Sequence, residues 1–207
     1  MIKILHIVIT ATLSIWVSMA QEKDTLYYSD GSIKAIGLAE EKAKSGIWEF
    51  FYPEGELNAR LTYKSDELDG IQEYYSFDGK LIASEFYKDG LPEDTATYFY
   101  PSGQIEKHGK YEDGLYTGEW LFYYENGILK RKGIYEVGIP NGHWRFYHET
   151  GQLNQEGKLM AGKEIGFWTY FDESGSQLYE GNWKDGKKAG QWYFFKKGKK
   201  REWKNFD

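Results

Sequence analysis

Side chains that could act as nucleophiles, acids, bases or metal ligands are sparse or scattered in this sequence. It contains no cysteine, which excludes a thiolate nucleophile, a disulfide framework and a cysteine-ligated zinc or iron–sulfur centre. Beyond residue 20 the histidines are His108, His143 and His148, and each has different sequence neighbours. No nucleophile, base and orienting acid can be paired from these positions.

Metal, carboxylate and phosphate chemistry find no support in the sequence either. His143 and His148 are five residues apart, so on one strand they would point to opposite faces and could not easily share a metal ion. The 32 carboxylates include no pair that stands out as glycosidase-like. The glycines are assigned to hairpin turns and not to a phosphate-binding loop. We therefore predict a protein that is not an enzyme and has no cofactor and no metal site.

Composition and charge narrow the function further. Aromatic residues make up 18% of the chain, which predicts an ordered protein despite 28% charged residues. The net charge of -6 argues against a nucleic-acid partner, because such binding needs clustered Lys and Arg. The charge is uneven, however, since residues 184–207 hold nine basic and three acidic side chains. We expect a molecule that is electrically polar from end to end.

The first 20 residues have the pattern of an export signal. Lys3 precedes a mostly apolar run, and Ser18-Met19-Ala20 ends in small residues at the positions that signal peptidase requires. This predicts cleavage between Ala20 and Gln21, and a mature chain located in the periplasm, at the cell surface or in the medium. The alternative is a transmembrane anchor, which normally needs about 20 uninterrupted apolar residues. The mature chain is expected to contain no integral membrane segment.

A strict internal repeat dominates the rest of the sequence. A glycine recurs every 24 residues, at Gly31, Gly55, Gly79, Gly103, Gly127, Gly151 and Gly175. The positions five and four residues before each of these glycines hold two aromatic residues, or a Leu-Tyr pair in the first case. Tryptophans follow the same 24-residue spacing, at 48, 120, 144, 168 and 192. Units start near residues 46, 70, 94, 118, 142, 166 and 190, with a half-unit cap at 24–45. Residues 21–207 are thus predicted to form a single repeat domain.

Each unit is predicted to be a β-hairpin with a short connector. Residues 46–52 are aromatic and alternate like a strand, 53–56 form a Pro-Gly turn, 57–63 form the return strand, and 64–69 form a polar connector. Two strands of about seven residues per unit make an antiparallel meander. The expected fold is all-β: one elongated, twisted antiparallel sheet of about seven hairpins and about fourteen strands, spaced about 4.8 Å apart.

The repeated motif resembles a known family. Gly46-x-Trp48-x-Phe50-Phe51, followed by Gly55 and a hydrophobic residue, with a later Tyr-x-x-Gly, is similar to the MORN repeat variant over about residues 26–203. The resemblance implies a β-hairpin scaffold that binds partners. Bacterial members often carry an antitoxin label, which implies a cytoplasmic protein partner and conflicts with the predicted export.

The repeated rings allow two interpretations. Trp48, Trp120, Trp144, Trp168 and Trp192 could form the core. Alternatively, because a single sheet has no second layer, these rings together with Tyr124 could be exposed to a ligand such as a glycan, a quaternary ammonium group or a peptide. The units that start at residues 70 and 94 depart from the motif. Gln72 and Ala96 stand in place of tryptophan, Asp94 in place of the opening glycine, and Pro92 lies in the connector. If that departure is functional, it predicts a bend or a shallow groove in mid-array.

The basic C-terminal run is the second candidate surface. Its members are Lys196, Lys197, Lys199, Lys200, Arg201 and Lys204. Lysines on the last strand would discourage edge-to-edge aggregation, while the alternative is contact with anionic lipid. We predict an exported, non-enzymatic binding or scaffold protein with a protein or envelope partner. The alternatives are a carbohydrate, cell-wall or anionic-lipid module and an antitoxin-like or immunity-like protein.

Overall fold

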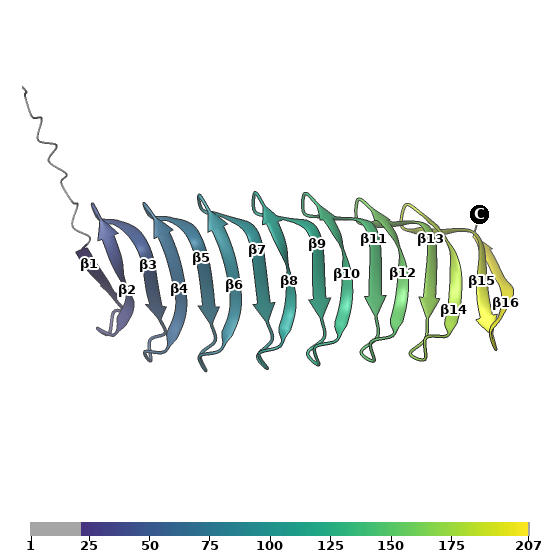
Figure 1. Ribbon diagram of the computed structural model, residues 1–207, viewed down its shortest axis with the longest axis horizontal. Helices are drawn as coiled ribbons and strands as arrows, with labels where there is room; N and C mark the ends of the chain where they lie inside the picture. The colour runs from purple at the N-terminus through teal and green to yellow at the C-terminus, as the bar shows by residue number, and fades with distance from the viewer. Residues whose placement is uncertain (1–21, 207) are drawn as a thin grey trace, which may run out of the picture.

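The computed structural model describes residues 22–206, and the predicted signal and cleavage site lie outside that range. Sixteen strands form one antiparallel sheet, each paired with its neighbours in the sequence (Figure 1). They are β1 (Glu22–Tyr27), β2 (Ile33–Glu40), β3 (Ala43–Phe51), β4 (Leu57–Lys64), β5 (Glu67–Tyr75), β6 (Leu81–Lys88), β7 (Leu91–Phe99), β8 (Ile105–Glu112), β9 (Leu115–Tyr123), β10 (Leu129–Glu136), β11 (Ile139–Tyr147), β12 (Leu153–Met160), β13 (Lys163–Phe171), β14 (Gln177–Lys184), β15 (Lys187–Lys196) and β16 (Lys199–Phe206).

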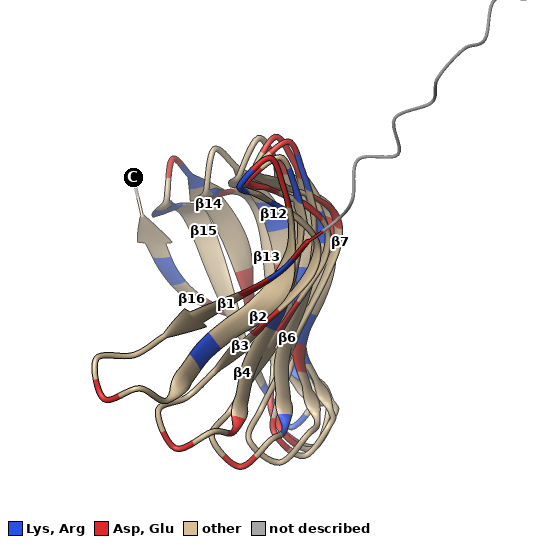
Figure 2. Ribbon diagram, turned by 90° about the vertical axis from the view of Figure 1, so that its left-hand side faces the viewer, with Lys and Arg blue, Asp and Glu red and all other residues tan. Residues whose placement is uncertain are grey.

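The predicted all-β repeat sheet is confirmed, but the number and length of its strands and the role of the glycines that open the units differ from the prediction. The sheet stays open, with β1 and β16 as its edges. Viewed along its length, the strands bow into a trough, and Asp and Glu occupy many of the turns along its long sides (Figure 2). The prediction of about fourteen strands is two too low, because the predicted half-unit cap forms a complete hairpin, β1 and β2. The strands are also longer than predicted, since the polar connectors are largely strand. Residues 64–69, for example, contribute to β4 and β5 and leave a two-residue turn at Ser65 and Asp66.

The glycines that open the units are not in turns, contrary to the prediction. Gly166, for instance, lies inside β13 with a φ of 65°. There the pairing moves from Glu156↔Thr169 to Lys158↔Ile165, so that three residues of β13 face the single residue Gly157 of β12. This is a β-bulge, and glycine adopts its left-handed conformation without a side-chain clash.

The bulge places each tryptophan ring over a glycine of the preceding strand. Trp168 lies against Gly157, and a Cβ built on that glycine would be 2.2 Å from the ring. The indole Nε1 of Trp168 donates a hydrogen bond to the carbonyl of Lys158 at 3.3 Å. The same contact of ring and glycine pairs Trp48 with Gly37, Trp120 with Gly109, Trp144 with Gly133 and Trp192 with Gly181. A single sheet thereby buries large rings without a second layer.

None of the described residues forms a helix long and apolar enough to cross a membrane.

Candidate functional site

One face of the sheet carries an almost continuous set of rings, here called the aromatic face. From β9 to β15 each ring centroid lies within 6.4 Å of the next one in the row. The row begins with Tyr116 and Trp120, whose centroids are 3.7 Å apart, and ends with Tyr170 and Trp192, whose centroids are 5.8 Å apart. The aromatic face comprises Trp48, Phe50, Tyr63, Tyr74, Tyr87, Tyr98, Tyr111, Tyr116, Trp120, Phe122, Tyr135, Trp144, Phe146, Trp168, Tyr170, Trp183, Trp192 and Trp203.

The five repeated tryptophans are core residues. Trp48, Trp120, Trp144, Trp168 and Trp192 are at most 2% exposed. Their burial agrees with the interpretation as core and is incompatible with the alternative in which their faces bind a ligand. A partner on this side of the sheet would instead contact the tyrosines and polar groups that surround them.

Tyr124 has a structural role between neighbouring units. Its hydroxyl donates a hydrogen bond to the carbonyl of Tyr147, 23 residues along the chain, at 2.8 Å. Tyr28, Tyr52 and Tyr100 make the equivalent bond in their units. At the next repeat position His148 takes this place, with Nε2 2.9 Å from the carbonyl of Phe171. These contacts tie each hairpin turn to the following one.

We expect Tyr124→Phe to lower the free energy of unfolding by about 1 kcal/mol, because the Tyr147 carbonyl loses its side-chain donor. Tyr27 is the matched control, since its ring is 61% exposed. Tyr27→Phe should change stability by less than about 0.5 kcal/mol. Urea titration followed by circular dichroism measures both variants, and equal effects would remove the role assigned to the Tyr124 hydroxyl.

The two units without tryptophan fill its place in different ways. Gln72 is fully buried; its Oε1 accepts from the backbone N–H of Thr62 at 2.9 Å and its Nε2 donates to the carbonyls of Thr62 and Gly70 at 3.1 Å. Ala96 is also buried, and it is paired directly with Glu85. In the other units the residue that faces tryptophan is a glycine. In these two units Leu61 faces Gln72, and Glu85 faces Ala96.

Glu85 is the centre of a polar cluster on the aromatic face. The hydroxyl of Tyr98 donates to the Glu85 carboxylate, and the hydroxyls of Tyr98 and Tyr111 are 2.7 Å apart. Burial raises the pKa values of Tyr74, Tyr87 and Tyr98, and that of Tyr111 to about 12, with the Glu85 charge adding to each shift. The four phenols therefore stay neutral around a half-buried carboxylate. Glu85 and the tyrosines Tyr74, Tyr87, Tyr98 and Tyr111 are together called the central cluster.

Two cations follow the central cluster along the same face. Lys107 Nζ lies 4.1 Å from the centroid of the Tyr98 ring and donates to the hydroxyl of Tyr116 at 2.7 Å. One unit further, the guanidinium of Arg131 lies 4.2 Å from the centroid of Phe122. Its Nε is buried and has no hydrogen-bond partner among the described residues. A negative site and two positive sites thus follow one another over about two units.

Comparison with known families now adds to this geometry. The profile of the family described as "MORN repeat variant" matches residues 44–65, 68–89, 95–113, 116–136 and 140–159. These five segments, which make up half of the chain, coincide with consecutive hairpins of the sheet. The chain belongs to the MORN repeat variant family. MORN repeats are in general non-enzymatic units that bind proteins or membranes.

Other comparisons add little to the MORN assignment. No curated protein matches the chain. Among solved structures, "Crystal Structure of TcdB2-TccC3-TEV" matches 84% of this chain at 10% identity with a TM-score of 0.22, and "Crystal Structure of TcdB2-TccC3-Cdc42" matches 86% at 12% identity with a TM-score of 0.20. The MORN chain spans only 12% and 13% of those chains.

The basic run of this MORN protein does not form one patch. Lys196, Lys197 and Lys199 lie at the last hairpin turn. Lys200 forms an ion pair with Glu180 at 2.5 Å, and Arg201 and Lys204 lie on the outer strand β16. Lys204 also lines a hollow together with lysines from other strands, which sequence reasoning did not bring together.

The histidines of the MORN units lie apart. His108 stacks on Tyr123, with centroids 5.8 Å apart, whereas His143 approaches Glu156 at 3.9 Å and His148 joins the turn contacts. Within residues 22–206, no group of three or more His, Cys, Asp or Glu side chains could hold a metal ion.

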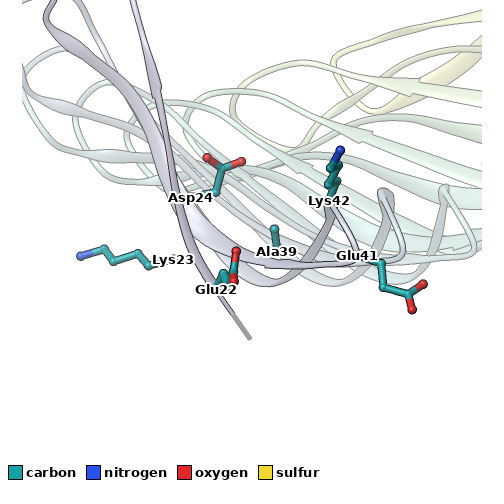
Figure 3. Close-up of a pocket in the computed structure, with 6 residues that line it drawn as sticks. All are labelled: Glu22, Lys23, Asp24, Ala39, Glu41 and Lys42. Carbon is teal, nitrogen blue, oxygen red and sulfur yellow. The ribbon is translucent and has the colours of Figure 1, made fainter. Parts of the chain in front are cut away.

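A hollow of about 410 Å³ at the N-terminal end holds acidic and basic side chains together. It is lined by Glu22, Lys23, Asp24, Ala39, Glu41 and Lys42 (Figure 3). In the close-up, Lys23 and Glu41 extend away from each other, and Asp24 and Lys42 stand apart. The charged groups do not converge on one point, so this hollow at the N-terminal end of the sheet shows no organised ligand site.

Proposed function

We propose that this MORN protein is an exported, non-enzymatic scaffold that binds a charged segment of a partner protein along its aromatic face. The observation that carries the proposal is the central cluster. Glu85 occupies the position of a structural glycine there and presents a carboxylate where two successive units lack tryptophan. A change that merely filled space would not require a charge at this position, because a half-buried charge has a desolvation cost.

The chemistry of the face suggests what the partner carries. A Lys or Arg side chain would meet the Glu85 carboxylate and the faces of Tyr74 and Tyr87, which favour cations. Acidic groups of the partner would meet Lys107 and Arg131. The long row of hairpins at fixed spacing suits an extended partner, since each unit repeats along the trough about every 9.6 Å. Export is supported by the pattern of residues 1–20.

The test compares capture by three forms of the full chain. Wild type, Glu85→Gln and Glu119→Gln are immobilised and exposed to envelope extracts. Glu119 is the control because it is exposed and lies 3.9 Å from Lys132, away from the central cluster. We expect one protein to be retained by wild type and by Glu119→Gln, and at least tenfold less of it by Glu85→Gln. Equal retention by Glu85→Gln, or no protein retained by wild type, would contradict the proposal.

A further inference from the structure

The C-terminal end of the aromatic face opens into a cleft of about 470 Å³. Tyr170, Tyr179, Trp183, Trp192 and Trp203 supply its rings, and Gln155, Glu164 and Lys188 complete its lining. β16 is an edge strand of the described sheet and is paired on one side only, with β15. Tyr179 and Trp203, whose ring centroids are 5.2 Å apart, are 39% and 46% exposed. At the equivalent positions of the preceding units the sequence has Lys107, Arg131 and Gln155, so this column offers rings to a ligand only at its C-terminal end.

The cleft also provides fixed hydrogen-bonding groups. The Trp183 Nε1 donates to the hydroxyl of Tyr170 at 3.0 Å, which orients that hydroxyl. Burial raises the pKa of Tyr170 to about 12, so its proton stays available for donation at neutral pH. Gln155 and Glu164 add an amide and a carboxylate to the same lining. Such groups would lose hydrogen bonds against acyl chains but gain them against a polyol.

Lys188 links the cleft to a second, basic hollow. Its Nζ lies 4.3 Å from the ring centroid of Trp192 and 4.6 Å from that of Trp203. No carboxylate of the described chain lies within 4.0 Å of this ammonium. Burial lowers the pKa of Lys188, in keeping with a cation held against rings. An anionic group near this position would relieve the incomplete solvation of the charge.

The basic hollow has a volume of about 760 Å³ and one sign of charge dominates it. Five lysines from four strands or their turns line it with a single carboxylate, Asp185. The lysines are Lys163, Lys184, Lys187, Lys188 and Lys204. Like charges brought together in a concave surface attract an anion and raise its local concentration.

We propose that the cleft and the hollow together bind an acidic glycan, that is, a sugar chain carrying carboxylate or phosphate groups. The apolar faces of sugar rings pack on Trp203 and Tyr179, as such rings do on aromatic side chains that combine an apolar face with a polar edge. Sugar hydroxyls bond to Tyr170, Gln155 and Glu164, and the anionic groups pair with the lysines through charge-assisted hydrogen bonds. A neutral glycan would leave the lysines unused, and a bare anion would leave the rings unused. This proposal is independent of the partner proposed at the central cluster, which lies several units away.

Binding of defined probes to the full chain tests the proposal. The probes are tetragalacturonate for carboxylates, a phosphorylated mannopentaose for phosphates, maltotetraose as the neutral sugar, inorganic phosphate, and vesicles containing phosphatidylglycerol. We expect quenching of tryptophan fluorescence to show saturable binding of at least one acidic oligosaccharide, at least tenfold tighter than maltotetraose and phosphate. The tighter of the two acidic probes identifies the anionic group.

Variants separate this site from general attraction between charges. Trp203→Ala and Lys188→Gln are each expected to weaken the acidic oligosaccharide at least tenfold, as is Tyr179→Ala, which leaves β16 intact. Lys200→Gln is the control, because Lys200 is paired with Glu180 and should leave the affinity within twofold. Three outcomes would overturn the proposal: no saturable binding of either acidic oligosaccharide, equal binding by all variants, or tighter binding to the vesicles than to both oligosaccharides.

Discussion

Gly157→Ala is expected to lower the free energy of unfolding by about 3 kcal/mol or more, in the range of losses caused by serious disruption of a core. The added methyl group would lie 2.2 Å from Trp168, a distance that forces the ring to move. The ring has little room, because it is 2% exposed and lies between Phe146 and Tyr170, each with its centroid 6.3 Å away. Moving it would also break the Nε1 bond to the Lys158 carbonyl.

Two comparisons assign this loss to the ring. Gly166→Ala, in the facing strand, adds a methyl group with nothing within 4 Å and a φ of +65°, so it should cost only the backbone strain of about 1–2 kcal/mol. In a Trp168→Ala background the collision partner is absent, and adding Gly157→Ala should cost less than about 0.5 kcal/mol, a strongly non-additive result. Urea unfolding followed by far-ultraviolet circular dichroism measures the wild type and all four variants. An equal cost of Gly157→Ala in both backgrounds would show that the ring is not responsible.

The repeat architecture could be predicted from the sequence because a meander with a constant 24-residue period leaves few alternatives. The hairpins, their order and the single open sheet follow from turn glycines and alternating rings. The bulges could not be predicted in the same way, because a glycine such as Gly46 is compatible with a turn as well as with a positive φ inside a strand. Only the pairing of strands distinguishes the two, and that pairing depends on the neighbouring unit.

The candidate sites were less predictable for a related reason. The run 196–204 is contiguous in sequence, yet the hollow draws its lysines from positions as distant as Lys163 and Lys204. The central cluster did leave a signal. Glu85 occupies the position where Gly109, Gly133, Gly157 and Gly181 recur, so comparing that column across units would have singled it out. Its tyrosine partners come from different strands and become neighbours only when the sheet forms.

Changing Gln72 to tryptophan should destabilise the sheet by more than about 2 kcal/mol, although tryptophan is the usual residue of the repeat. Leu61 pairs with Gln72 where other units place glycine, so the new ring would meet the Leu61 side chain and be overpacked. The three hydrogen bonds of Gln72 to Thr62 and Gly70 would be lost as well. Buried backbone groups without partners have a high free-energy cost.

Adding Leu61→Gly should recover most of that loss, because it supplies the space that every tryptophan of the repeat occupies. The rest of the unit already fits: Gly70-Ile71 matches Gly46-Ile47 in the unit that contains Trp48. Leu61→Gly alone should be destabilising, since it opens a cavity beside Gln72 and adds a flexible residue to β4. The two changes are thus each harmful and jointly tolerated, with a coupling free energy of about 2–3 kcal/mol in urea unfolding. Additive losses would mean that the tryptophan and its facing glycine are not the unit of packing on which this sheet depends.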